Sequence, residues 1–283
     1  MPPIGKDNTM ATATSATPAE GALEAPSRDV PRFPREVAPG FFWFSSCLDL
    51  LVRGKPLHNH NSCFLVMGSA ATVLVDTGMP YGWAEIRTQL TDVLAGRPLD
   101  YVFATHPEAP HAGNAGPLLR TWPAARLCGD LRNYHLFFPE FQDRFHHMRP
   151  GDALDLGGRS LIAVPAIVHD LVNSLWAYDT GQRILFVSDG YPYTHAHSSD
   201  QCAMTAEELP ESPKVEDTGP VIEGALGWTR HVDAELTIRD LEDFLVRYPT
   251  DIIAPAHGGV ITHPPAITEV FKAGLRRVNW WTQ

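Results

Sequence analysis

The sequence predicts a layered α/β domain with its helices on the outside, because two patterns alternate along most of the chain. Short apolar runs bounded by Gly, Pro, Asp or His predict buried strands, and apolar residues at helical spacing predict the helices between them. The chain has 283 residues, of which 44% are hydrophobic and 19% charged, so it can bury a substantial core. We place this domain at residues 41–283.

The predicted strands are apolar at nearly every position, which is typical of strands covered on both faces. Residues 63–67 and 72–75 flank a Gly68-Ser69 turn signal and predict a β-hairpin that ends at Asp76. Further runs of the same kind occupy residues 101–104, 161–164, 175–178, 184–187 and 252–254.

Three stretches carry apolar residues every three or four positions and therefore predict amphipathic helices packed on the core. They occupy residues 83–94, 238–245 and 267–278.

Two segments depart from this alternation. Residues 1–40 are rich in Ala, Pro, Ser and Thr and lack the apolar stretch of a secretory signal, so we predict a flexible tail. Residues 195–230 are acidic and contain several Pro and Gly. They predict either an acidic insertion that covers the site as a lid or a solvated loop without function.

Composition excludes several classes of protein. The chain has 22 Lys and Arg against 33 Asp and Glu, a net charge of −11, which argues against nucleic acid as a partner. No apolar stretch approaches the roughly 18 to 20 residues that a membrane span requires, so no membrane partner is expected. The four cysteines, Cys47, Cys63, Cys128 and Cys202, form no C-x-x-C pair. They predict separate thiols in a reducing cytoplasm, not a disulfide framework or a zinc ribbon.

The strongest chemical signal follows the strand predicted at 101–104, where His106, Glu108 and His111 fall within six residues. A loop at a strand end can bring two imidazoles and a carboxylate to one centre while the strand holds its root. Taken alone, the same residues also fit a polar surface loop, because 13 histidines are spread along the chain.

Three more residues of ligand type each follow an apolar run, namely His169, Asp189 and His257. Strand ends are where crevices form in layered α/β folds, so these residues are placed to meet the first three. Any single one also fits a strand-end cap or a hydrogen-bonded core histidine. Together, two carboxylates and four imidazoles suit zinc, iron or manganese without a thiolate.

These motifs resemble the metallo-β-lactamase superfamily, which implies an αββα sandwich. Asp76 in Val75-Asp76-Thr77-Gly78 is similar to the buried structural aspartate of that family. The commonest superfamily motif, H-x-H-x-D-H, builds dizinc hydrolases, whereas H-x-E-x-x-H with Glu108 resembles the diiron branch. That branch comprises the flavodiiron proteins and the oxygen-binding diiron proteins. Residues 60–65, 151–157, 186–189 and 255–258 resemble other segments of the branch.

The resemblance implies a set of metal ligands. The first iron would bind His106, Glu108 and His169, with Asp189 as the bridging carboxylate. The second metal would bind His111 and His257.

One position departs from the family pattern. Pro110 stands where the family has an aspartate, which implies a weaker or more open second site, completed by water, substrate or a nearby residue. Four residues are candidates for that role by position only: Asp170, Tyr193, His195 and His197.

We therefore predict a cytoplasmic non-haem diiron oxidoreductase that binds or activates dioxygen, reducing it or oxidising a small organic substrate. Carboxylates such as Glu108 and Asp189, the predicted catalytic pair, favour iron or manganese over zinc. The cofactor would be two iron ions, with manganese or zinc as alternatives. The sequence has no Gly-rich loop for a flavin or nicotinamide, so electrons would come from a separate reductase or from the substrate. The sequence leaves open whether the protein forms a homo-oligomer.

Two alternatives to this function remain. The first is a dimetal hydrolase acting on an ester, a lactone or a phosphodiester, which Glu108 and Pro110 argue against. The second is a non-catalytic oxygen-binding sensor with the same metal site.

Overall fold

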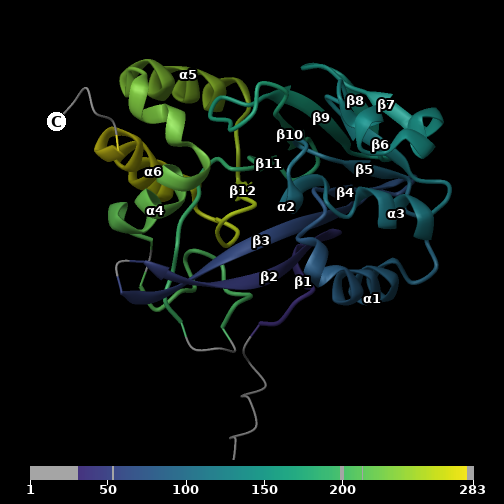
Figure 1. Ribbon diagram of the computed structural model, residues 1–283, viewed down its shortest axis with the longest axis horizontal. Helices are drawn as coiled ribbons and strands as arrows, with labels where there is room; N and C mark the ends of the chain where they lie inside the picture. Colours follow the sequence, from purple (N-terminus) through teal and green to yellow (C-terminus); the bar gives the residue numbers. More distant parts are fainter. Residues whose placement is uncertain (1–30, 53, 198–200, 212, 279–283) are drawn as a thin grey trace, which may run out of the picture.

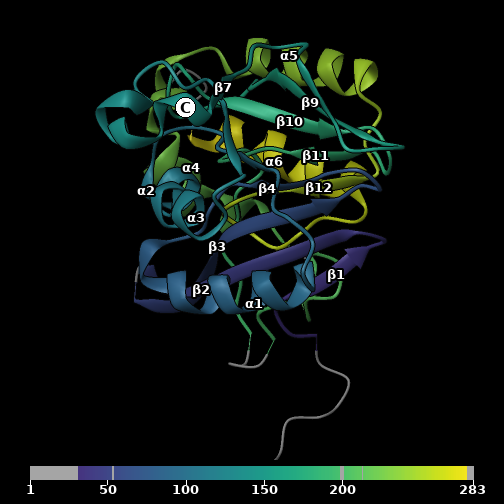
Figure 2. The same ribbon diagram turned by 90° about the vertical axis from the view of Figure 1, so that its right-hand side faces the viewer.

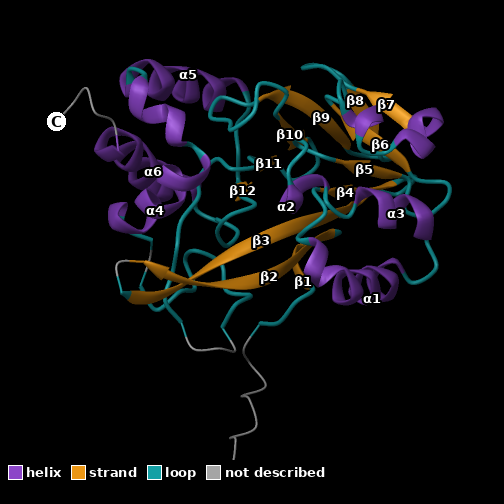
Figure 3. Ribbon diagram, viewed as in Figure 1, coloured by secondary structure: helices purple, strands orange, loops and turns teal. Residues whose placement is uncertain are grey.

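The computed structural model describes residues 31–52, 54–197, 201–211 and 213–278, and it is a four-layered sandwich. Two β-sheets face each other, and helices cover their outer faces (Figures 1 and 3). Figure 2 shows the layers from the side, with α5 at the top, the two sheets below it and α1 at the bottom. The predicted αββα sandwich is confirmed.

The first sheet has seven strands in sequence order, antiparallel from β1 to β4 and parallel from β4 to β7. They are β1 (Arg35–Ala38), β2 (Phe41–Val52), β3 (Lys55–Met67), β4 (Thr72–Val75), β5 (Tyr101–Phe103), β6 (Arg126–Gly129) and β7 (Phe145–His147). The second sheet has the order β12-β11-β10-β9-β8. Its strands are β8 (Ala153–Asp155), β9 (Ser160–Pro165), β10 (Leu175–Asp179), β11 (Ile184–Phe186) and β12 (Ile252–Ala254).

The helices divide between the two outer faces (Figure 1). Beside the first sheet lie α1 (Trp83–Leu94), α2 (Ala109–Ala112) and α3 (Ala115–Thr121), and beside the second lie α4 (Val215–Ala225), α5 (Ala234–Arg247) and α6 (Pro264–Val278). Single 3₁₀ turns occur at Pro80–Gly82, Tyr134–Leu136, Pro139–Arg144 and Gly227–His231. No helix in the described ranges has the length and apolar character needed to cross a bilayer.

Three apolar layers hold the sandwich together. Phe41, Phe64 and Phe186 belong to the layer between the sheets. Ile86 of α1 packs in the layer outside the first sheet. Phe271 of α6 packs in the layer outside the second sheet. The three predicted helices correspond to α1, α5 and α6, and the predicted hairpin is β3–β4, with Met67 opposite Thr72.

Part of the tail predicted at residues 1–40 is folded. Residues 1–30 lie outside the described part, but β1 pairs with β2 inside the predicted tail. Phe33, Val37 and Ala38 pack against the layer between the sheets. The Ala and Pro composition hid this short edge strand, and the described fold includes residues from Phe33 onwards.

The acidic segment predicted at 195–230 contains α4, which packs against α6. The Glu207 carboxylate accepts hydrogen bonds from the Thr262 and His263 amides, and Glu208 pairs with Arg35. Glu207 and Glu208 therefore fasten this segment to the rest of the domain, whereas Asp200 lies outside the described residues.

Candidate metal centre

The centre lies where strands of both sheets end. His106 and Glu108 follow β5, and the short helix α2 carries His111. Asp189 follows β11, and His257 follows its parallel neighbour β12. Because parallel strands present their carboxyl ends at one edge, the loops after them bring these side chains together.

The Asp189 carboxylate stands in the middle of the centre. Its Oδ2 lies 3.5 Å from His106 Nε2. Its Oδ1 lies 3.2 Å from His111 Nε2 and 3.2 Å from His257 Nε2. Glu108 Oε2 lies 3.7 Å from His106 Nε2. The two oxygens of Asp189 therefore face two different sets of ligand atoms.

Three of these atoms are buried and form no hydrogen bond within the described part of the chain: His106 Nε2, His111 Nε2 and Asp189 Oδ1. Buried polar atoms are nearly always hydrogen-bonded, so such a group calls for an explanation. Imidazole and carboxylate donors that share a common space without bonding to one another fit bound metal ions. The residues present therefore fit a metal pair.

Neighbouring side chains fix the orientation of the first two imidazoles. His111 Nδ1 lies 2.9 Å from Asp76 Oδ2, and the other oxygen of Asp76 accepts hydrogen bonds from the Thr105 amide and hydroxyl. His106 Nδ1 lies 3.1 Å from Ser188 Oγ. In both rings this leaves Nε2 for a metal, the arrangement usual for ligating histidines.

The third imidazole is held by the backbone. His257 Nδ1 donates to the His60 carbonyl oxygen over 3.1 Å, which directs its Nε2 towards Asp189. His60 lies on β3 of the first sheet. This bond therefore couples a ligand of the second sheet to the first.

The charges in the centre are strongly coupled. Burial opposes ionisation of Asp189, yet the three imidazoles hold the pKa of its carboxyl well below the usual range. Burial lowers the pKa of His111, but Asp76 and Asp189 outweigh it and raise the pKa to about 10. Burial and the neighbouring His111 lower the pKa of His106. A metal cation here would displace the His111 proton, because a ligating imidazole must be neutral.

Five of the six residues predicted as ligands come together in two overlapping groups whose donor atoms lie within 4.8 Å of one another. The groups are His106, Glu108 and His111, and His111, Asp189 and His257. His169 belongs to neither group: its Nδ1 lies 3.2 Å from the Ala166 carbonyl oxygen, and its ring lies 5.3 Å from the Trp228 ring.

The residues considered by position only have other contacts. Pro110 lies in α2 and offers no donor. Asp170 lies next to Glu108, and burial together with Glu108 raises the pKa of Asp170 to about 6. The Tyr193 hydroxyl donates to the Gly259 carbonyl in the core. His195 and His197 stack beside His58 and His60, away from the two groups of donor atoms.

Sequence reasoning missed Thr105 and Ser188. Each immediately precedes a predicted ligand, His106 and Asp189, and that adjacency was the available signal. The Thr105 and Ser188 hydroxyls lie 2.8 Å apart, so they link the two halves of the centre.

The chain belongs to the metallo-beta-lactamase superfamily, whose family model matches residues 57–257. Within it, several structural neighbours are named as flavodiiron proteins, the branch that the sequence resembles, and the curated relatives are named as an oxidase and as nitric oxide reductases.

The chain is 25% identical over 254 residues to coenzyme F420H(2) oxidase of Methanothermobacter thermautotrophicus, covering 84% of this chain and 60% of that protein. It is 28% identical over 221 residues to the anaerobic nitric oxide reductase flavorubredoxin of an Enterobacter species, covering 75% and 43%. The flavodiiron protein of Giardia intestinalis shares the fold, with a TM-score of 0.66, 19% identity and coverage of 88% and 60%. The chain thus spans about half the length of these curated relatives.

Proposed function

We propose that this protein is a non-haem diiron oxidoreductase that acts on dioxygen, reducing it or using it to oxidise a small organic substrate. One observation carries the proposal. The two oxygens of buried Asp189 face separate ligand sets, Oδ2 towards His106 and Oδ1 towards His111 and His257. A carboxylate placed in this way is suited to bridge two metal ions.

We assign the ligands on this basis. His106, Glu108 and His169 would hold the first iron, His111 and His257 the second, and Asp189 would bridge them. His169 would join by turning its ring away from the Ala166 carbonyl oxygen. Because Pro110 offers no donor, the second iron keeps an open position for a small ligand.

The donor set favours iron over zinc. Glu108 and Asp189 contribute two negative charges and hard oxygen atoms, and Asp76 makes His111 a more basic ligand through their hydrogen bond. When bound, the iron pair supplies the one-electron redox steps that dioxygen chemistry needs.

The exposure of the ligands indicates how a gas reaches the centre. The Glu108 side chain is 45% exposed, whereas those of His106, His111 and Asp189 are at most 1% exposed. Dioxygen therefore enters on the side of Glu108. Asp170 lies next to Glu108 on this side, and burial together with the Glu108 charge raises the pKa of its carboxyl to about 6.

The names of the relatives support a diatomic gas as the substrate, since one is an oxidase and another a nitric oxide reductase. Both names also imply reduction by an electron donor. We propose that a separate reductase or the organic substrate supplies the electrons.

Metal content and spectra test the function. Protein purified without oxygen should contain about two irons per chain, and its ultraviolet-visible spectrum should change to a ferric form on exposure to dioxygen. His111→Ala and Asp189→Asn should reduce the iron content and abolish the dioxygen-dependent change. Asp155→Asn, which alters an exposed carboxylate in β8, is the control.

The outcomes separate the alternatives. Dioxygen consumption with a chemical reductant would support the oxidoreductase, and nitric oxide consumption alone would reassign the gas. A reversible oxygen-dependent spectrum without turnover would replace the proposal with an oxygen sensor. Zinc in place of iron, with hydrolysis of esters, would replace it with a hydrolase.

A further inference from the structure

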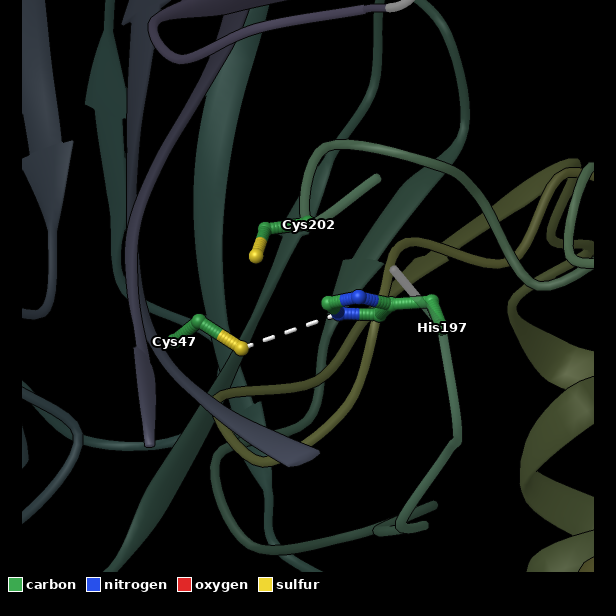
Figure 4. Close-up of side chains that lie close together, drawn as sticks. All are labelled: Cys47, His197 and Cys202. Atoms are coloured by element: carbon green, nitrogen blue, oxygen red, sulfur yellow. Dashed lines mark hydrogen bonds between the residues drawn. The ribbon is translucent and has the colours of Figure 1, made fainter. Parts of the chain in front are cut away.

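A second cluster of metal-ligand side chains lies where the β2–β3 ribbon meets the segment that follows Asp189. Cys47 of β2, His197 and Cys202 place one ligand atom each within 4.8 Å of one another. The Cys47 Sγ atom lies 3.7 Å from His197 Nε2. Figure 4 shows both sulfur atoms and the imidazole edge facing a common space. None of these residues belongs to the diiron centre.

A fourth donor lies beside this cluster. His58 Nδ1 lies 3.3 Å from Cys47 Sγ, and the His58 ring stacks on the His197 ring with centroids 4.1 Å apart. His58 Nδ1 also lies 2.9 Å from Asp49 Oδ1, and because the Asp49 side chain is 89% exposed, water can readily replace His58 there. Two thiols and two imidazoles are the donor set of tetrahedral zinc sites.

A third imidazole, that of His195, lies next to the cluster. The His195 ring lies 4.7 Å from the His197 ring and 4.6 Å from the His60 ring. His195 is 5% exposed, and both its ring nitrogens form no hydrogen bond within the described residues. A buried imidazole with two unsatisfied nitrogens next to the His197 ring is a second indication of a bound ligand.

A disulfide would account for less of this arrangement. It would join Cys47 to Cys202 and give the stacked imidazoles no role. A metal ion uses the thiols and the imidazoles together, and it neutralises the two thiolates. Each thiol would lose its proton to solvent as the metal binds, so that a divalent cation and two thiolates leave no net charge.

We propose that Cys47, Cys202, His197 and His58 bind one zinc ion, separate from the diiron centre. Thiolates select zinc here, while carboxylates select iron at the centre. The ion would link His197 and Cys202, which follow Asp189 in the chain, to β2 and β3. It would thereby steady His60, whose ring lies 2.7 Å from the Cys202 carbonyl oxygen and whose own carbonyl oxygen accepts the His257 hydrogen bond.

Cobalt(II) is the probe for this site, used on the full-length, thiol-reduced protein. We expect one equivalent to produce an intense thiolate-to-cobalt charge-transfer band in the near ultraviolet. Cys47→Ser and Cys202→Ser should each abolish the band, and His58→Ala should weaken cobalt binding at least about tenfold. Cys128→Ala, which removes a thiol on β6, should retain it. His106→Ala should also retain the band, whatever happens to its iron.

Alkylation of the unmodified protein tests the same site without any variant. Zinc should protect Cys47 and Cys202 from a thiol reagent, as seen by peptide mass mapping, and a chelator should remove the protection. A cobalt spectrum without a thiolate band would overturn the proposal. So would a Cys47–Cys202 disulfide in protein purified under reducing conditions, or equal alkylation with and without zinc.

Discussion

At the scale of single residues, Asp76 shows how one buried carboxylate prepares the centre. It accepts hydrogen bonds from Thr105 and lies 2.9 Å from His111 Nδ1. In Asp76→Asn, an amide group would face the His111 N–H, and the ring would lose its fixed orientation. We expect about 10- to 100-fold weaker metal binding at the second site, measured by iron titration. Asp155→Asn should bind iron normally, and equal affinity in the two variants would show that Asp76 has no such role.

Buried histidines make stability depend on pH. Burial lowers the pKa of His60 to about 4, and burial together with His60 and His197 lowers that of His195 to about 2. Because both values lie below the unfolded value of 6.5, the unfolded chain binds protons first as the pH falls. The resulting stability is complete above pH 6.5 and declines below it. Below pH 6.5, His111, with a pKa of about 10, is protonated in the folded and in the unfolded chain. It therefore adds no pH dependence to the stability in that range.

For the chelator-treated protein, we therefore expect each of these two histidines to cost about 1.4 kcal/mol of unfolding free energy per pH unit between pH 6 and pH 5. His195→Asn should reduce the slope by the share of one histidine. Urea unfolding across this range measures it. An unchanged slope in His195→Asn would mean that His195 is protonated in the folded state.

Some residues of the site could be predicted from the sequence, and others could not. The grouping of five residues was predictable from two signals: His106, Glu108 and His111 fall within six residues after one apolar run, and Asp189 and His257 each follow another. The ring orientation of His169 was not, because it depends on Trp228, which lies far along the chain. The grouping of Cys47 with Cys202 was hidden for the same reason, since wide spacing gave no local signal.

At the scale of elements, strands with continuous apolar runs were predictable and the long β2–β3 ribbon was not. The first half of β3 contains buried polar residues, which break the apolar pattern. Distant partners satisfy them: Asn59 donates to the Tyr193 carbonyl, and the His60 ring contacts the Cys202 carbonyl. The strand therefore depends on tertiary contacts, which no local window of sequence contains.

Two helical glycines should respond in opposite ways to alanine. A Cβ at Gly274 of α6 would lie 2.2 Å from Thr218 Oγ1 of α4, whereas a Cβ at Gly224 of α4 meets no atom within 4 Å. Gly224→Ala should stabilise the protein by about 1 kcal/mol through helix propensity. Gly274→Ala should destabilise it by about 1 to 3 kcal/mol, because α4 and α6 must move apart. Urea unfolding measures both, and stabilisation by Gly274→Ala would show that the two helices do not approach closely.

At the scale of the whole molecule, the candidate metal centre lies between the two sheets and takes residues from both. His106, Glu108 and His111 follow a strand of the first sheet, and Asp189 and His257 follow strands of the second. Without metal, ligand atoms of His106, His111 and Asp189 are buried without a hydrogen bond within the described residues, and the sheets hold together through the apolar layer between them. Bound metal would therefore add a direct link across this layer.

Removing the metal should therefore lower the thermal stability of the whole domain, and not only loosen the loops. An ion present at a thousandfold excess over its Kd stabilises the folded state by about 4 kcal/mol, which corresponds to about 10 °C in Tm for a domain of this size. Scanning calorimetry of iron-loaded and chelator-treated protein should show this difference. In Asp189→Asn, which lacks the bridging carboxylate, chelation should change Tm very little. Asp155→Asn should behave like the unmodified protein. If chelation left Tm unchanged in a protein that had carried two irons, the centre would lie on a frame that is rigid without it, and the apolar layer alone would hold the sheets together.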